Sequence, residues 1–134
     1  MLIDWIDAYK LGIPQVDNDH KKLVDLLNSF FTCSQDGGDI QALGAILNQL
    51  VDETRLHFQR EEVMLDRHNY PDLAAHSSTH ERLILQLSHF QTPYLEGQRD
   101  QKITVETAEF LRNWLLHHIQ NDDMAYRSYV KKLS

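Results

Sequence analysis

The sequence predicts an all-α protein, an antiparallel up-down four-helix bundle with an extended N-terminal arm. Apolar residues recur at helical spacing in four segments, which are separated by short breaks. The 134 residues include only five Gly and three Pro, too few turn residues for a many-stranded sheet. Four amphipathic helices joined by short loops are typical of an antiparallel bundle. We expect residues 1–134 to form one domain, because this length supports a single core.

The first 16 residues show no helical period and contain Pro14. They hold many apolar side chains, so we expect residues 1–16 to lie against the body as an extended arm rather than in water. The first helix is expected over about 17–32, with Asp17 as its N-cap. The second is expected over about 39–66, after a break at 35–38.

Prolines help to delimit the last two helices. Pro71 suits the first turn of a helix over about 71–91, since proline lacks the amide hydrogen that this turn does not use. Pro93 and Gly97 indicate the next connection, and the last helix is expected over about 103–130.

Composition excludes several classes of partner. The net charge is −7 and Lys and Arg are scattered, which argues against nucleic acid. No apolar run approaches the roughly 18 residues of a membrane span. Cys33 is the only cysteine, and the N-terminus carries acids where a signal peptide carries bases. We therefore expect a cytoplasmic protein without a nucleic-acid or membrane partner; its protein partners are not indicated.

Six polar side chains fall on the four stripes that should face the core. They are His20, His57, Glu61, His76, His80 and His118. His57 and Glu61 are four residues apart, as are His76 and His80, so each pair points from one helix face into the same space. A single such histidine is more often a hydrogen-bonded core residue. Six on four helices indicate a metal site, because a buried carboxylate needs a pairing charge and no Lys or Arg lies on these stripes.

The type of ligand narrows the choice of metal. Imidazole and carboxylate suit iron, copper, zinc or nickel, and this many ligands exceeds what one such ion takes. Two ions that share bridging carboxylates would accommodate them. An aspartate of the last helix can add a seventh ligand, and regular helix geometry favours Asp122, four residues after His118, over Asp123.

Four sequence motifs together resemble the hemerythrin family, in its single-domain bacterial form. They are the segment from Gly12 to His20, the segment from His57 to Glu62, His76 with His80, and the segment from Trp114 to Asp123. As a set, in this order and spacing, the motifs are highly specific, and they span nearly the whole chain. The resemblance implies two non-haem iron ions (Fe²⁺/Fe³⁺) joined by an oxo or hydroxo bridge.

The resemblance also implies a role for each ligand. His76, His80 and His118 would hold one iron, His20 and His57 the other, and Glu61 and Asp123 would bridge them. The second iron would keep an open position for O2, inside an apolar pocket. The residues that match the family's pocket positions are Trp114, Leu115 and Ile119.

The same motif decides between the two aspartates. The family's last motif places histidine and aspartate five residues apart, which selects Asp123. A regular α-helix does not present both residues to one point, so we expect a π-type distortion near 120–122.

The expected function is reversible O2 binding, as a carrier or store, without enzymatic turnover. Azide and NO are expected as other exogenous ligands. The predicted site has five neutral imidazoles and two carboxylates, whereas oxidising di-iron bundles use mostly glutamates. Two alternatives remain: an O2 or redox sensor module, although no output domain follows Ser134, and a di-iron enzyme such as a peroxidase, ferroxidase or NO scavenger.

Other polar residues are interpreted as structural. His68 and His89 are expected in water, and His117 at the surface or near the pocket mouth. Glu62 is interpreted as part of a solvated helix face. The acceptors that should orient the ligand histidines cannot be identified from the sequence.

Overall fold

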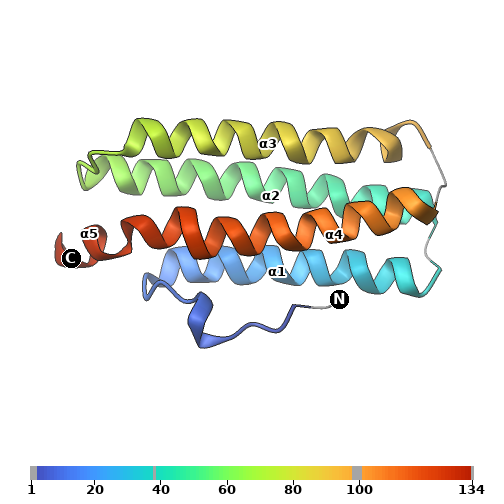
Figure 1. The fold of residues 1–134 in the computed structure, drawn as a ribbon, viewed down its shortest axis with the longest axis horizontal. Helices are drawn as coiled ribbons and strands as arrows, with labels where there is room; N and C mark the ends of the chain where they lie inside the picture. Colours follow the sequence, from blue (N-terminus) through green and yellow to red (C-terminus); the bar gives the residue numbers. More distant parts are fainter. Residues whose placement is uncertain (1–2, 38, 98–100, 134) are drawn as a thin grey trace.

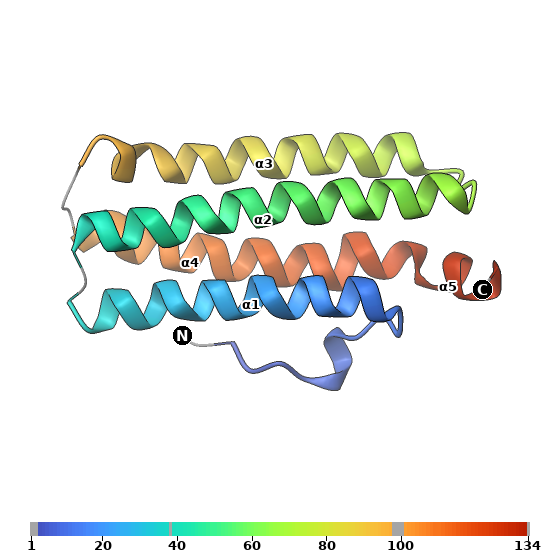
Figure 2. The same ribbon diagram turned by 180° about the vertical axis from the view of Figure 1, so that it is seen from behind.

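The protein is an all-α four-helix bundle, as the sequence predicts. The computed structural model describes residues 3–37, 39–97 and 101–133. Its long helices are α1 (Pro14–Gln35), α2 (Ile40–Arg67), α3 (Leu73–Leu95) and α4 (Gln101–His117); η2 (His118–Asp123) and α5 (Met124–Leu133) continue α4. The long helices run side by side, and successive helices point in opposite directions (Figures 1 and 2). Packing of α1 on α2 and α4, and of α3 on α2 and α4, closes the bundle.

The N-terminal arm lies along α1 (Figure 1) and is held by hydrogen bonds to side chains of the helices. Asn28 of α1 accepts from the amide of Ile3 (2.8 Å) and donates to its carbonyl (2.9 Å), so both backbone polar groups of Ile3 are paired. Arg127 of α5 donates to the carbonyl of Leu11 (2.8 Å). A short 3₁₀ helix, η1 (Asp7–Tyr9), interrupts the otherwise irregular arm.

Helix α1 begins at Pro14, ahead of the expected Asp17, because proline occupies the first helical position. Asp17 therefore lies in the first turn instead of at the N-cap. Its carboxylate accepts from the amides of Leu11 (2.7 Å) and Gly12 (3.0 Å) and so fixes the turn by which the arm enters the helix.

The third helix differs from its expected bounds at both ends. Pro71 lies in a turn ahead of Leu73 rather than in the helix. Pro93 lies inside the last turn, and the helix continues to Leu95. A proline this close to the C-terminus removes only one hydrogen bond, which the chain tolerates in a final turn.

The core consists of two apolar clusters. The larger one fills the half of the bundle towards the α1–α2 connection and includes Leu27, Phe30, Leu47 and Leu111. The smaller one closes the other end with Leu11, Val16, Leu65, Tyr126 and Val130. Along α2, His57 and Glu61 come between Phe58 of the larger cluster and Leu65 of the smaller one. Polar groups therefore lie where the two clusters meet.

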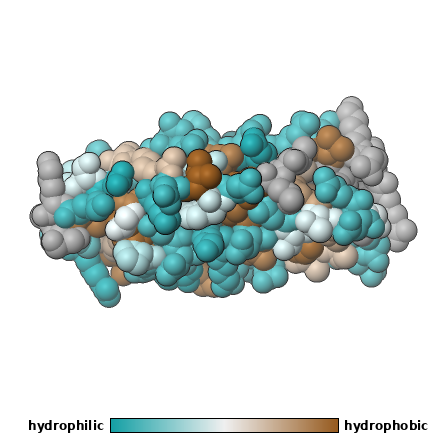
Figure 3. Space-filling model, turned by 90° about the horizontal axis from the view of Figure 1, so that it is seen from below, coloured by the Kyte–Doolittle hydropathy of each residue, from teal (hydrophilic) through white to brown (hydrophobic). Residues whose placement is uncertain are grey.

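On the face shown in Figure 3, polar residues predominate and apolar residues form only small separate areas. Among the described residues, no helix combines the length and the apolar character that crossing a membrane requires.

The larger cluster should dominate stability. Leu47→Ala removes a side chain that is 0% exposed, and we expect it to lower the free energy of unfolding by about 2–5 kcal/mol. Leu85 is 72% exposed, so Leu85→Ala should change that free energy by no more than about 0.5 kcal/mol. Urea denaturation of the two variants measures both values; equal losses would contradict this assignment of the core.

Candidate metal centre

Seven polar side chains from α1, α2, α3 and η2 meet in the core. They are His20, His57, Glu61, His76, His80, His118 and Asp123, all buried. They form two overlapping sets, and within each set one ligand atom per residue lies within 4.8 Å of all the others. The first set is His20, His57, Glu61, His118 and Asp123; the second is Glu61, His76, His80 and Asp123. Both carboxylates belong to both sets.

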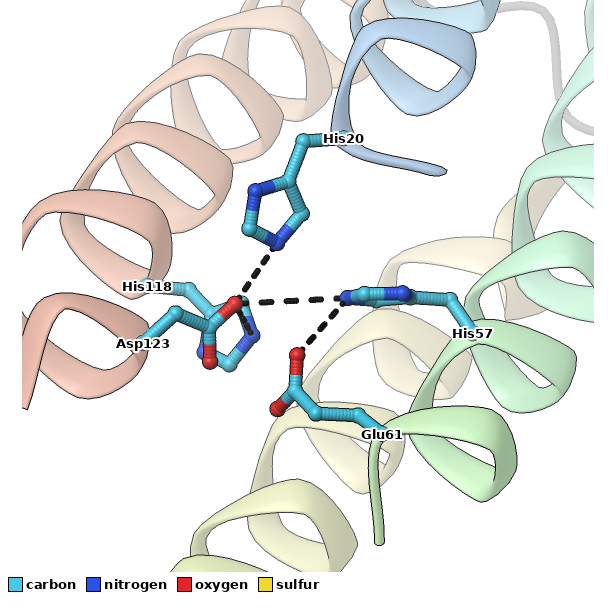
Figure 4. Close-up of side chains that lie close together, drawn as sticks. All are labelled: His20, His57, Glu61, His118 and Asp123. Carbon is cyan, nitrogen blue, oxygen red and sulfur yellow. Dashed lines mark hydrogen bonds and ion pairs between the residues drawn. The ribbon is translucent and has the colours of Figure 1, made fainter. Parts of the chain in front are cut away.

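Figure 4 shows the first set, in which three imidazoles surround the two carboxylates. The Nε2 atoms of His20 and His118 lie 2.6 and 3.1 Å from Oδ2 of Asp123. The Nε2 atom of His57 lies 3.2 Å from Oε2 of Glu61 and 4.0 Å from Oδ2 of Asp123. These three histidines come from three different helical segments, and each directs Nε2 at the same small volume.

In the second set, α3 supplies two imidazoles one turn apart. The Nε2 atoms of His76 and His80 lie 2.5 and 3.0 Å from Oε1 of Glu61. His76 also lies 3.4 Å from Oδ1 of Asp123. All five imidazoles thus present the same nitrogen, Nε2, to the shared pair of carboxylates.

The expected π-type distortion is present and explains why Asp123 reaches the site. Residues His118–Asp123 form a π-helix between α4 and α5. The wider turn places both His118 and Asp123 inside, with the Asp123 side chain 0% exposed. Asp122 is 25% exposed and its Oδ2 lies 3.1 Å from Nδ1 of His118. The aspartate that regular geometry favoured therefore contacts the other nitrogen of the same histidine.

Carboxylates outside the cluster orient three of the five histidines. Nδ1 of His57 donates to Asp19 (3.0 Å), Nδ1 of His80 to Glu62 (3.1 Å) and Nδ1 of His118 to Asp122 (3.1 Å). Such bonds fix the tautomer and leave the Nε2 lone pair facing inward. The expectation that Glu62 belongs to a solvated face is wrong, since its carboxylate also accepts from Ser77.

These acceptors could have been found by a simple signal in the sequence. Each of them, Asp19, Glu62 and Asp122, is the direct neighbour of a cluster residue. A neighbour on a helix is turned by about 100°, so it leaves the core face and can reach the outer nitrogen of a histidine. Asp19 and Glu62 reach histidines on an adjacent helix, whereas Asp122 reaches His118 one turn away in the same segment.

Two further contacts were not predicted. Arg60 donates to both oxygens of Asp19 (3.0 and 2.8 Å). Burial alone would raise the pKa of Asp19, but the contacts with His57 and Arg60 outweigh burial and lower this pKa to about 2. Tyr126, fully buried, donates to Oε2 of Glu61 (3.0 Å). Each of these bonds holds an acidic side chain in one orientation.

Several buried atoms in the cluster have no hydrogen-bond partner among the described residues. Nε2 of His57, Nε2 of His118 and Oδ1 of Asp123 are such atoms. The two nitrogens lie close to carboxylate oxygens without the geometry of a hydrogen bond. Buried polar atoms rarely remain unpaired because desolvation is costly. Lone pairs of imidazole and carboxylate that converge in this way suit a divalent metal cation.

The charges of the cluster compensate one another. Burial alone raises the pKa of Asp123, but His118, His20 and His57 outweigh it and hold the pKa well below its usual value. The pKa of Glu61 is also lowered, because contacts with His57, His76 and His80 exceed the effects of burial and of Asp123. Conversely, the carboxylates overcome burial and raise the pKa of His76 to about 9 and that of His118 to about 10. Protons and metal cations therefore compete for the same nitrogens.

The predicted pocket residues Trp114, Leu115 and Ile119 are buried in the larger apolar cluster. Trp114 and Leu115 precede His118 by about one turn, and Ile119 follows it directly. Of the histidines set aside, His89 and His117 are exposed and His68 is half-buried. His117 pairs with Asn121 on the surface (3.2 Å).

The comparisons with known proteins place this site in a family. The family model described as the hemerythrin HHE cation binding domain matches residues 11–129. The chain belongs to the hemerythrin family. It is 32% identical to a bacteriohemerythrin of Stenotrophomonas maltophilia over 97% of this chain and 82% of that protein. It is also 28% identical to a bacteriohemerythrin of Methylococcus capsulatus, over 93% and 94% of the two chains.

More distant hemerythrins share the length and the fold. Myohemerythrin-1 of Phascolopsis gouldii is 26% identical over 92% of this chain and 90% of its own. A crystal structure of wild-type hemerythrin superimposes with a TM-score of 0.84 at 27% identity, covering 97% of this chain and 98% of that one. The cluster described above is therefore the candidate cation site of a hemerythrin domain.

The metal-free protein should lose stability in alkaline solution. The pKa of His76 is raised from 6.5 to about 9 and that of His118 to about 10. The contribution of these two histidines to the free energy of unfolding is therefore complete below pH 6.5 and is lost as pH rises through 9–10. Asp19, with its pKa lowered from 3.8 to about 2, contributes above pH 3.8 and loses that contribution as pH falls through about 2. Thermal melting of metal-free protein across this range should give a melting temperature that decreases above neutral pH. A flat profile up to pH 10 would contradict the ion pairs described here.

Proposed function

We propose that this protein binds O2 reversibly at two non-haem iron ions held by the seven clustered side chains. The observation that carries the proposal is the pair of overlapping ligand sets that share Glu61 and Asp123. Two ions with common bridging carboxylates require such an arrangement, whereas one ion requires only a single set. Membership of the hemerythrin family supports iron as the metal.

The five histidines are proposed to divide unequally between the ions. His76, His80 and His118 bind one iron, and His20 and His57 bind the other, with Glu61, Asp123 and an oxo or hydroxo group as bridges. By its ligand atom, His118 belongs to the set of His20 and His57, although its ring centre lies 5.6 Å from that of His80 and 6.4 Å from that of His20. Its assignment to the three-histidine side rests on the resemblance to hemerythrin.

The ligand set favours binding over oxidation of a substrate. When bound, the two ferrous ions supply the electrons that O2 takes up on binding and returns on release. The five imidazoles are neutral ligands, and only two carboxylates add negative charge, so the site stabilises high oxidation states less than a glutamate-rich site does. Asp19, Glu62 and Asp122 keep three imidazoles turned with Nε2 inward.

Apolar side chains are proposed to protect the open position beside His20 and His57. Trp114, Leu115 and Ile119 are buried and belong to the same apolar cluster as Phe58, whose ring contacts those of His57 and His118. An apolar wall admits O2 and NO but excludes bulk water, and so slows irreversible oxidation. Azide is expected as a further exogenous ligand of the iron.

The proposed role is that of a cytoplasmic carrier or store rather than a sensor or an enzyme. Relatives that this chain matches over 82%, 94% and 90% of their length are named as bacteriohemerythrins or myohemerythrin. We propose no protein partner.

Metal content and absorption spectra test the proposal directly. Iron-loaded protein should contain two irons per chain, and the oxidised form should give a new charge-transfer band when azide is added. Addition of O2 to the reduced protein should produce a spectrum that disappears under argon and returns with O2. Direct conversion to the oxidised form, without a reversible O2 spectrum, would contradict the carrier role while leaving the metal site intact.

Glu61 should be indispensable because it belongs to both ligand sets. Glu61→Gln keeps the shape of the side chain but removes the charge that bridges two cations, so we expect iron content to fall from two per chain to one or none. Glu109→Gln, an exposed change on α4, is the matched control and should keep two. Elemental analysis of the purified variants decides. Retention of both irons in the Glu61 variant would remove this residue from the site.

A further inference from the structure

A cavity of about 500 Å³ lies where the C-terminal half of α2 meets the start of α1 and α5. Pockets that enclose small ligands have volumes of roughly 300–1,000 Å³, so this one is large enough to hold a small organic molecule. The described residues that line it include no member of the seven-residue cluster. The cavity is therefore separate from the candidate metal centre.

One face of α2 supplies the main wall of this cavity. Arg60, Val63, Met64 and Arg67 all line it. Because they are spaced by three, four and seven residues, they form a single stripe along the helix, with the two apolar side chains between the two arginines. Val63 is 51% exposed, so part of this apolar stripe faces water.

The charge of the lining determines the class of ligand that fits. The chain has a net charge of −7, yet the described residues around this cavity include two arginines and no acidic side chain. Arg60 already donates to both oxygens of Asp19. Arg67 is exposed and has no hydrogen bond or ion pair within the described part of the chain. A guanidinium binds a carboxylate well, because its two parallel N–H groups match the two carboxylate oxygens.

Another cavity of similar size, about 510 Å³, lies between α2 and α3 and shows the opposite character. Glu62 and Glu81 line it beside Arg55, and the Glu62 carboxylate accepts from His80 and Ser77. An anion in that cavity would meet two carboxylates. The preference for an anionic ligand is therefore expected only of the cavity beside Arg67.

We propose that the cavity beside Arg67 binds a small organic monocarboxylate with an aliphatic chain, of the kind of a medium-chain fatty acid. The carboxylate binds the free guanidinium of Arg67. The chain packs against the apolar side chains of the cavity, which are Val63, Met64, Ile13 and Val130. Contact with these walls removes the chain from water, which favours binding in proportion to the apolar area that is covered. This inference goes beyond the proposed O2 binding and does not depend on it.

Calorimetric titration of the iron-loaded full chain with octanoate tests the site. One octanoate should bind per chain and leave the absorption spectrum of the iron unchanged, since no cluster residue lines the cavity. Acetate, which lacks the chain, and octanamide, which lacks the charge, should each bind several-fold more weakly. Binding of either compound as tightly as octanoate would overturn the proposed class of ligand.

Two substitutions separate the charge from the apolar wall. Arg67→Gln removes the free guanidinium, and Val63→Asp places a negative charge where the aliphatic chain should lie. Each should raise the Kd for octanoate several-fold. Both positions are exposed, so both variants should keep the native helical circular dichroism and the native iron content.

Arg55→Gln is the matched control. Arg55 is also an exposed arginine of α2, but it lines the cavity that faces α3. This variant loses the same charge from the same helix and should keep the native Kd for octanoate. An equal loss of affinity in Arg55→Gln and Arg67→Gln would mean that octanoate responds to the overall charge of the protein, and it would overturn the site.

The remaining outcomes are equally decisive. Native affinity in Arg67→Gln would overturn the proposed contact with the carboxylate. A change in the iron spectrum that persists in Arg67→Gln would place octanoate on the metal instead of in the cavity. A chain that fails to bind O2 reversibly but binds octanoate through Arg67 would overturn the proposed function and leave this inference standing.

Discussion

Two carboxylates in the core, Glu61 and Asp123, impose the main constraint on this bundle. Each is 0–1% exposed, and charged groups so deeply buried persist only when paired charges or a metal compensate them. The compensation comes from five imidazoles on three helices and the π-helix, so each of these segments supplies part of the charge that the two carboxylates need. This cluster therefore ties α1, α2, α3 and η2 together in one register.

The two apolar clusters, one on either side of the buried histidines and carboxylates, stabilise the bundle. The larger one, with Leu47, Phe30 and Leu111, stabilises the half of the bundle that holds no ligand. The smaller one is completed by Leu11 of the arm, which brings that segment into the end of the bundle. Apolar packing keeps the dielectric low around the carboxylates, which strengthens every charge interaction among them and makes an unpaired group more costly.

The side chains of the cluster are oriented by hydrogen bonds to residues around them, and some of those residues are held by further contacts. Histidine can present either nitrogen, and outer carboxylates select Nε2 for three of them. Asp19 and Glu62 act from neighbouring helices on His57 and His80, and Asp122 acts on His118 from the same segment. Arg60 in turn holds Asp19, and Tyr126 holds Glu61. A binding function needs such preorganisation, because ligands that must rotate into place would cost entropy for each ion bound.

The sequence by itself determined the number of helices and the inward placement of six cluster residues. It did so because the period of 3.6 residues decides which side chains share a face, whatever the helices pack against. The choice of Asp123 over Asp122 required the hemerythrin motif, since a regular helix favours the wrong residue.

Only the tertiary structure decided which nitrogen each histidine presents and which carboxylates orient it. Asp19 and His57, or Glu62 and His80, are far apart along the chain and meet only through the packing of one helix against another. Such contacts depend on the rotation of one helix about its axis relative to the next, and the pattern within a single helix carries no information about that angle.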